Sequence, residues 1–279
     1  MNIGLIGNGF VGNAILENLK KSFRFVIYDK NLSRSNVGNI REVCHSAKII
    51  FVALPTPMKK DGTCDLSIVY NTMVQISHWY DNNIIILKST VLPGTCDQIK
   101  LSHPNLRLVF SPEFLTEANH VEDFKKCNRI IMGGDPIDVV ECFKMLSQVF
   151  PDKAYLPTDL RTAEMVKYYI NNFLAVKVSF ANEMKQICDS IDVDYNSVKE
   201  LALFDKRIGR SHLMVPGPDG SSGFGGTCFP KDINAMISFA KQNNIDSTIL
   251  EAAWKKNLIV RKNKDWLKLK GRAISEKEK

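Results

Sequence analysis

The chain has 279 residues, enough for one large domain or two of ordinary size, and its hydrophobic content of 44% and charged content of 24% exclude a disordered, collagen-like or membrane-spanning protein. The net charge of +7 comes from residues 255–279, where ten Lys and Arg stand against three Asp and Glu, so residues 1–254 hold 27 charges of each sign. The body of the protein therefore gives no reason to expect nucleic-acid binding.

The amino-terminal segment lacks the marks of an export signal. Residues 1–7 contain no Lys or Arg ahead of their short apolar stretch, and Asn2 excludes myristoylation, which requires glycine at that position. No apolar run approaches the roughly 18 residues of a transmembrane helix. We therefore expect a cytoplasmic protein with no membrane association.

The first half of the chain repeats a strand–helix pattern. Its short runs rich in Ile, Val and Phe are Asn2–Ile6, Arg24–Tyr28, Lys48–Leu54, Asn83–Leu87, Arg107–Phe110 and Arg129–Met132. Most of them are continuously apolar, which is typical of parallel strands covered on both faces. Helical stretches lie between or after them, at Val11–Lys21, Leu66–Trp79 and Asp138–Phe150. The predicted fold class is α/β, with a Rossmann-type doubly wound sheet in residues 1–157.

The second half reads as a helical domain over residues 158–262. A helix without Pro or Gly is predicted from about Arg161 to Ser190, with apolar side chains around much of its circumference, so we expect it to be buried, in part at a subunit interface. The remaining predicted elements are a helix at Tyr195–Leu203, a Gly- and Pro-rich loop at Val215–Thr227, helices near Lys231–Gln242 and Ser247–Lys262, and a basic tail at 263–279.

The segment Gly7-Asn8-Gly9-Phe10-Val11-Gly12 follows a strand and opens a helix, as in dinucleotide-binding sites. The first glycine makes the turn, the second lets the backbone approach a pyrophosphate, and the third lets helix and strand pack closely. The next strand ends at Asp29, which can accept hydrogen bonds from ribose hydroxyls and repel a 2′-phosphate. NAD is therefore favoured over NADP, although Lys30 and Arg34 weaken the preference. A glycine turn that binds nothing is the alternative.

Cys228 stands apart from the other cysteines. The chain has seven, an odd number, with no CxxC pair, so we expect no disulfide framework and no metal site, and most thiols should be reduced and buried. Cys228, however, directly follows the glycine-rich residues 223–227, with Lys231 and Asp232 three and four residues later. A nearby ammonium favours the thiolate, which is the nucleophile. On this local evidence, one more buried cysteine at a helix start is an equal alternative.

Three further clusters carry polar side chains. Glu164, Lys167 and Asn171 share one face of the long helix. Residues 88–95 and 111–117 each follow a strand, and ligands of such sheets bind beyond the strand ends. A solvated stripe and ordinary polar turns or helix starts are the alternatives for these clusters.

Six ordered segments together resemble the UDP-glucose/GDP-mannose dehydrogenase family over nearly all of residues 1–240. They are GNGFVG (7–12), LPTP (54–57), KSTVLPGT (88–95), SPEFLTEA (111–118), AEMVKYYINNFLAVKVSFANE (163–183) and GFGGTCFPKD (223–232). The resemblance implies NAD-dependent oxidation of the C6 alcohol of a nucleotide sugar to a carboxylate in two hydride transfers, with UDP-glucose as the default substrate. It further implies that Cys228 adds to the intermediate aldehyde, giving a thiohemiacetal and then a thioester that water hydrolyses.

The resemblance also implies roles for individual residues. Lys167 would stabilise the oxyanion, Asn171 would position the same oxygen, Asp232 and Thr90 would orient a water, and Glu113 and Glu117 would assist hydrolysis or substrate positioning. The cofactor would be bound by Gly7, Gly9, Phe10, Val11, Gly12, Asp29, Lys30, Pro55, Thr56, Thr90 and Lys231. The substrate would be bound by Phe114, Leu115, Lys167, Asn171, Arg207, Phe224 and Gly225, with Arg207 sometimes reaching across the interface of a homodimer formed through the long helix.

Two features depart from the family pattern. The loop 213–224 looks longer than in many members, and only residues 229–279 follow Cys228, where the family usually carries a third α/β domain. The basic tail would then meet the substrate's diphosphate or a partner's acidic surface, or form a solvated end beyond Gly271. Two alternatives stay open: a single-step 3-hydroxyacid or 6-phosphogluconate type of dehydrogenase, and an NAD-binding protein without catalysis. The segment around Cys228 argues against the first, and the intact set of polar residues argues against the second.

Overall fold

The computed structural model describes residues 1–276 and divides into two units. Unit 1 comprises Met1–Thr56 and Leu66–Lys167, and unit 2 comprises Pro57–Asp65 and the chain from Tyr168 onward. The division differs from the boundary expected near residue 157, because the first turns of the long helix belong to unit 1 and a short loop from the first half belongs to unit 2. In the described part of the chain, no helix is both long enough and apolar enough to cross a membrane.

Unit 1 is built on a seven-stranded sheet in the order β2-β1-β3-β4-β5-β6-β7. All neighbouring strands pair in parallel except β5 and β6, which are antiparallel. The strands are β1 (Asn2–Ile6), β2 (Arg24–Tyr28), β3 (Ile49–Val52), β4 (Ile84–Leu87), β5 (Arg107–Phe110), β6 (Arg129–Gly134) and β7 (Ala154–Thr158). The predicted doubly wound α/β sheet is thus confirmed, with β7 as an additional strand.

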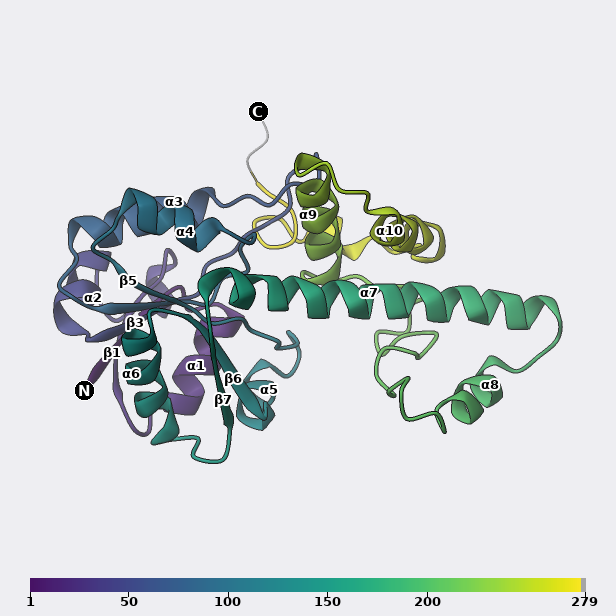
Figure 1. Cartoon of the computed structure of the whole chain (residues 1–279), viewed down its shortest axis with the longest axis horizontal. Helices are drawn as coiled ribbons and strands as arrows, with labels where there is room; N and C mark the ends of the chain where they lie inside the picture. Colours follow the sequence, from purple (N-terminus) through teal and green to yellow (C-terminus); the bar gives the residue numbers. More distant parts are fainter. Residues whose placement is uncertain (277–279) are drawn as a thin grey trace. The chain divides into compact units, whose positions relative to one another are not determined.

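Helices cover both faces of this sheet (Figure 1). One face packs against α2 (Ile40–Ser46), α3 (Ser67–His78) and α4 (Thr95–Ser102), and the other against α1 (Phe10–Leu19), α5 (His120–Lys126) and α6 (Pro136–Ser147). Because both faces are covered, every residue of β3 and β4 is buried. The strand order reverses between β1 and β3, and ligands of doubly wound sheets bind beyond the strand ends at such a point.

Unit 2 is helical. The long helix α7 (Leu160–Ser190) begins in unit 1 and continues here, followed by α8 (Tyr195–Ala202), α9 (Phe229–Gln242) and α10 (Thr248–Val260). Ala175, Phe224, Ile233 and Ala253 form one buried cluster of unit 2. Part of the α7 surface is not covered within the single chain: Phe180 and neighbouring apolar side chains on one face are exposed.

The end of the described chain packs into unit 2, contrary to the expected solvated end beyond Gly271. Ala273 is buried, and its carbonyl accepts a hydrogen bond from the Met58 N–H at 2.9 Å. The Ser275 N–H donates to the Met58 carbonyl at 2.8 Å, and its hydroxyl donates to Asp65 at 2.9 Å. These pairings join segments far apart in the chain, which local sequence patterns do not reveal. Residues 277–279 of the predicted tail lie outside the described residues.

Candidate functional site

The three glycines after β1 lack a side chain for different structural reasons. A Cβ on Gly7, whose φ is +91°, would lie 2.3 Å from the Ala53 carbonyl oxygen, and one on Gly12 would lie 2.0 Å from the Gly7 carbonyl oxygen. Gly9 is different: its φ is −81°, and a Cβ there would meet nothing within 4 Å. Neither backbone strain nor protein packing requires Gly9 to lack a side chain. The open space lies at the amino terminus of α1, which has no side-chain cap, and the amino terminus of a helix suits a phosphate.

Asp29 fixes this loop to the end of β2. Its Oδ2 accepts a hydrogen bond from the Asn8 N–H at 2.7 Å, and its Oδ1 accepts one from the Asn31 N–H at 2.8 Å. The Asp29 N–H itself donates to the Ser35 hydroxyl at 2.7 Å. The carboxylate is therefore held in one orientation beside the glycine turn, with lone pairs left for ribose hydroxyls. These residues fit the adenosine and pyrophosphate portions of NAD.

The other residues predicted to bind the cofactor in unit 1 lie near the same strand ends. Phe10 and Val11 begin α1, Pro55 is exposed and Thr56 is buried in the loop after β3, and Lys30 is exposed. Ser89, one residue before Thr90, accepts a hydrogen bond from the Leu54 N–H at 2.8 Å and so joins the loops that follow β3 and β4.

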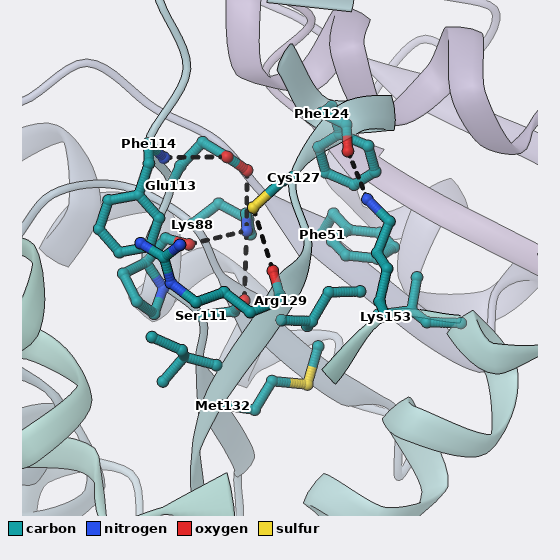
Figure 2. A pocket seen from close by; sticks show the side chains of 14 residues that line it. Phe51, Lys88, Ser111, Glu113, Phe114, Phe124, Cys127, Arg129, Met132 and Lys153 are labelled. Atoms are coloured by element: carbon teal, nitrogen blue, oxygen red, sulfur yellow. Dashed lines mark hydrogen bonds and ion pairs between the residues drawn. The ribbon is translucent and has the colours of Figure 1, made fainter. Parts of the chain in front are cut away.

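A buried ion pair organises the polar residues that follow β5 (Figure 2). The Lys88 ammonium lies 3.0 Å from Glu113 Oε2 and donates to the Ser111 hydroxyl at 3.2 Å. Lys167 Nζ donates to the Glu113 carbonyl and lies 5.4 Å from the centre of the Phe114 ring. The structure therefore brings together the predicted residues Glu113, Phe114 and Lys167. The sequence analysis assigned no role to Lys88. Its position directly after a continuously apolar strand could have indicated one, because a buried ammonium needs a partner.

Two predicted residues of the same segment take other positions. Leu115 packs against the apolar cluster on the α1 face of the sheet. Glu117 lies in a turn, and its carbonyl oxygen is 3.0 Å from His120 Nδ1.

Glu164, which belongs to the predicted polar stripe on α7, accepts hydrogen bonds from the Gly94 and Cys96 N–H groups at 2.6 and 2.8 Å. Glu164 is thus a buried cap for the amino terminus of α4, and burial raises its pKa.

In unit 2, Cys228 occupies the N-cap position of α9, with a second polar cluster on the first turn. Asp232 is 1% exposed; its N–H donates to the Cys228 carbonyl at 3.0 Å. Asp232 Oδ2 accepts from the Asn171 amide at 2.6 Å and Oδ1 accepts from the Lys231 ammonium at 2.5 Å. The Thr227 hydroxyl lies 3.7 Å from the Cys228 sulfur. The structure therefore joins Asn171 of α7 to the start of α9 through one buried carboxylate.

Charges around Lys231 keep it protonated. Burial lowers the pKa of Lys231, but the Asp232 carboxylate and the nearby cysteines Cys228 and Cys64 outweigh it, so the pKa is raised.

Other cysteines are in different surroundings: burial raises the pKa of Cys44 to about 11 and that of Cys142 to about 12, which holds both thiols protonated. Residues 1–276 include all seven cysteines, and none of them is joined in a disulfide there.

The remaining residues predicted to bind substrate have contrasting surroundings. Arg207 is 89% exposed at its side chain and pairs with Asp205 at 2.5 Å. Phe224 is buried among aromatic side chains, 5.9 Å from the Phe229 ring centre, so its side chain belongs to the core of unit 2. A Cβ on Gly225 would lie 2.1 Å from an Asp265 carboxylate oxygen.

Comparison with known proteins places both units in one family. The NAD binding domain of the UDP-glucose/GDP-mannose dehydrogenase family matches residues 15–151, and the central domain of the same family matches residues 161–258. The chain is 38% identical over 254 residues to a UDP-glucose 6-dehydrogenase of Rickettsia bellii, covering 88% of this chain and 56% of the relative. It is 36% identical over 233 residues to a UDP-glucose 6-dehydrogenase of Pseudomonas aeruginosa, covering 79% and 50%. This chain spans about half the length of these curated relatives.

A solved structure gives the same result. The structure of a UDP-glucose dehydrogenase from the archaeon Pyrobaculum islandicum superimposes with a TM-score of 0.83 at 29% identity, covering 92% of this chain and 68% of that one. The likeness extends over both the sheet and the helical part, since so much of this chain is aligned. On the sequence matches and this structural agreement, the chain belongs to the UDP-glucose/GDP-mannose dehydrogenase family.

Proposed function

We propose that this chain carries out the NAD-dependent four-electron oxidation of a nucleotide sugar, UDP-glucose to UDP-glucuronate, with Cys228 as the covalent nucleophile. The observation that carries the proposal is the buried Asp232, which holds Asn171 and Lys231 at the start of the helix that Cys228 caps. A dehydrogenase that performs a single hydride transfer needs no cysteine there. The activity named for the relatives supports the substrate class.

In the proposed reaction, NAD would supply the hydride acceptor when bound, and the two oxidations would consume two NAD, one for each hydride. The first oxidation converts the C6 alcohol to an aldehyde and releases a proton. The Cys228 thiolate then adds to the aldehyde carbon, and the hydride lost from the resulting thiohemiacetal leaves a thioester. Water attacks the thioester carbonyl, the carbon–sulfur bond breaks, and the thiol and carboxylate are released.

The surrounding residues take supporting roles in this proposal. Lys167 stabilises the developing oxyanion and Asn171 positions the same oxygen, a use of preorganised donors that is effective when they are buried, as both are here. Asp232 and Thr90 orient a water, and Glu113 and Glu117 assist hydrolysis or substrate positioning. Phe114 and the Gly225 backbone are proposed to line the sugar site, whereas the side chains of Leu115 and Phe224 pack in the cores of their units. The exposed Arg207 is proposed to reach the substrate of a partner subunit.

The proposal is tested by the stoichiometry of turnover. The chain is incubated with NAD and panels of UDP-sugars, GDP-sugars and small hydroxy acids, and NADH is counted per substrate consumed. Two NADH with an acid product from a nucleotide sugar support the proposal. One NADH with a ketone or aldehyde product identifies a single-step dehydrogenase, and NAD binding without turnover of any substrate identifies an inactive binding protein.

The cofactor site makes its own prediction. Gly9→Ala is expected to weaken NAD binding roughly tenfold or more, because the methyl group occupies the space where the pyrophosphate approaches. Stability should fall by only about 1 kcal/mol or less, the cost of alanine at an N-cap. The control, Gly12→Ala, is expected to lower stability by roughly 1–3 kcal/mol, because its Cβ collides with the Gly7 carbonyl. Calorimetric titration with NAD and thermal unfolding measure the two effects; unaltered NAD affinity in Gly9→Ala would contradict the assignment.

We further propose a homodimer formed through α7. Tyr169, Phe173, Phe180 and Ile187 are between 47% and 68% exposed. At 100° per residue they fall within about 40° of one another around the helix, so they form one apolar stripe. We propose that the same stripe of a second copy packs against it, because an apolar stripe with near-heptad spacing is complementary to itself.

This interface predicts the effect of a charge in its middle. Phe180→Asp is expected to weaken self-association by about 2 kcal/mol or more, which is roughly thirtyfold in Kd. Sedimentation equilibrium should show the species shift toward the monomer mass of 31.5 kDa. Leu101→Asp, at a more exposed apolar position on α4, should leave the mass unchanged. A monomeric wild-type chain, or an unchanged Phe180→Asp, would refute the proposed interface.

A further inference from the structure

The backbone just before Cys228 is held by side chains from distant parts of unit 2. This segment, Gly223–Gly226, contains three glycines and no regular secondary structure, yet its peptide groups are bonded at fixed distances. The bonds are Gly223 N–H to Asn182 Oδ1 at 3.1 Å, Phe224 N–H to Asn257 Oδ1 at 2.7 Å, Asn257 Nδ2 to the Phe224 carbonyl at 3.0 Å, and Gly226 N–H to Asp265 Oδ2 at 2.9 Å.

Asn257, on the last turns of α10, makes the central contact. Its side chain is 0% exposed, and its amide binds both the N–H and the carbonyl of Phe224, as a neighbouring strand would. A Cβ on Gly223 would lie 2.4 Å from Asn257 Oδ1, so only glycine permits this approach. The φ of Gly223 is +71°, a second reason for glycine there.

Arg261 orients the second holder, Asp265. The Arg261 side chain is 2% exposed, and its Nη2 lies 3.0 Å from Asp265 Oδ1, leaving Oδ2 for the Gly226 N–H. Its Nη1 lies 2.6 Å from Asp219 in the preceding part of the loop. A Cβ on Gly225 would collide with both Arg261 and Asp265. A buried guanidinium between two carboxylates, filling the space beside a glycine, is a built support for this backbone.

We propose that Asn257, Arg261 and Asp265, here named the α10 cradle, are positioning residues that fix Cys228 for attack on the aldehyde. Without these hydrogen bonds the glycine segment would sample many conformations, and ordering it would cost conformational entropy. The cradle orders the segment before substrate binds, and it fixes the direction of the chain at the start of α9. A misplacement of about 1 Å can reduce a rate by roughly 100-fold, so the covalent step depends on it. The proposal rests on the assigned role of Cys228.

The cradle is tested with Asn257→Asp, which keeps the acceptor for Phe224 N–H and loses the donor to its carbonyl, and with Asp265→Ala. The Asp265 side chain is 31% exposed, so this second variant keeps the test possible if a change at buried Asn257 prevents folding. Asn243→Ala is the control, since its exposed amide bonds a backbone carbonyl at the other end of α9. Two readouts are needed: the separate rates of the alcohol and aldehyde oxidations, and the rate of Cys228 alkylation by iodoacetamide against pH, with Cys127 as internal reference.

The cradle variants are expected to slow the aldehyde oxidation at least about tenfold more than the alcohol oxidation, so that aldehyde accumulates. Cys228 alkylation should change at least about fivefold, with Cys127 and the Asn243→Ala control unchanged. A loss of both oxidations by one factor, in step with lowered thermal stability, would show a merely structural role and overturn the proposal. Unchanged Cys228 alkylation would also overturn it. If the wild type oxidises no nucleotide sugar, the proposed function fails and the cradle's part in the aldehyde step fails with it; a shift in Cys228 alkylation would then show only that the cradle positions the thiol.

Discussion

Cys228→Ser is expected to abolish acid formation while leaving the first oxidation, so that NADH per sugar consumed falls from two toward one. A serine hydroxyl is far less ionised than a thiol at neutral pH and adds poorly to the aldehyde. The loss in the rate of acid formation should be roughly 10³-fold or more, in keeping with nucleophile deletions in other covalent mechanisms. Product analysis by mass spectrometry, with an amine trap for the aldehyde, measures the outcome.

A matched control separates this effect from the loss of any thiol. Cys188 is buried near the far end of α7 and has no part in the proposed chemistry, so Cys188→Ser should retain two NADH per sugar. Acid formation at the wild-type rate by Cys228→Ser would rule out the thioester route.

Asp232→Ala is expected to lower the free energy of unfolding by about 3–5 kcal/mol, because it leaves the mostly buried Lys231 ammonium and the buried Asn171 amide without their partner. Activity should fall as well, since the start of α9 is no longer joined to α7. Denaturant titration measures the stability. Asp189→Ala removes an exposed ion pair with Lys185 and should cost about 1 kcal/mol or less.

The same pair sets a pH dependence with a definite sign. The pKa of Lys231 is raised above its ordinary 10.5, so the pair's contribution to stability is complete below pH 10.5 and is lost as the pH rises through the raised value. In Asp232→Ala the Asp232 carboxylate no longer offsets the burial of Lys231, so the pKa of Lys231 falls. The difference in free energy of unfolding between the wild type and the variant should therefore begin to change at a lower pH. A stability difference independent of pH up to strongly alkaline conditions would contradict the coupling.

The central strands were predictable because burial on both faces makes them continuously apolar, as in β3 and β4. The edge strand β7 was not predicted, since its residues are partly exposed and include Pro157. The helices α2, α4 and α5 have only seven or eight residues each, too few to display a clear period.

The candidate site divides in the same way. Local motifs identified the glycine turn, Asp29 and Cys228, because each is a short pattern next to a predictable element. The contact of Asn171 with Asp232 spans 61 residues and that of Phe224 with Asn257 spans 33, and no local pattern encodes such pairs. Asn257, Arg261 and Asp265 do recur every four residues, but only Asn257 lies in α10, with Arg261 at its C-cap and Asp265 beyond it, so helical spacing does not group them. The burial of Asn257 and Arg261, which only the tertiary structure reveals, distinguishes them from solvated polar residues.

The hydrogen bond between Asp65 and Ser275 has a consequence for how the chain is made. Its two residues lie 210 positions apart, and the loop that contains Asp65 belongs to unit 2 although the residues on either side of it belong to unit 1. At the usual pace of about 5–20 residues per second, Asp65 leaves the ribosome roughly 10–40 s before its partner is synthesised. Throughout that interval the loop 57–65 lacks the hydrogen bonds that the carboxyl-terminal segment later supplies, so it is expected to be open to a protease or a chaperone in the nascent protein.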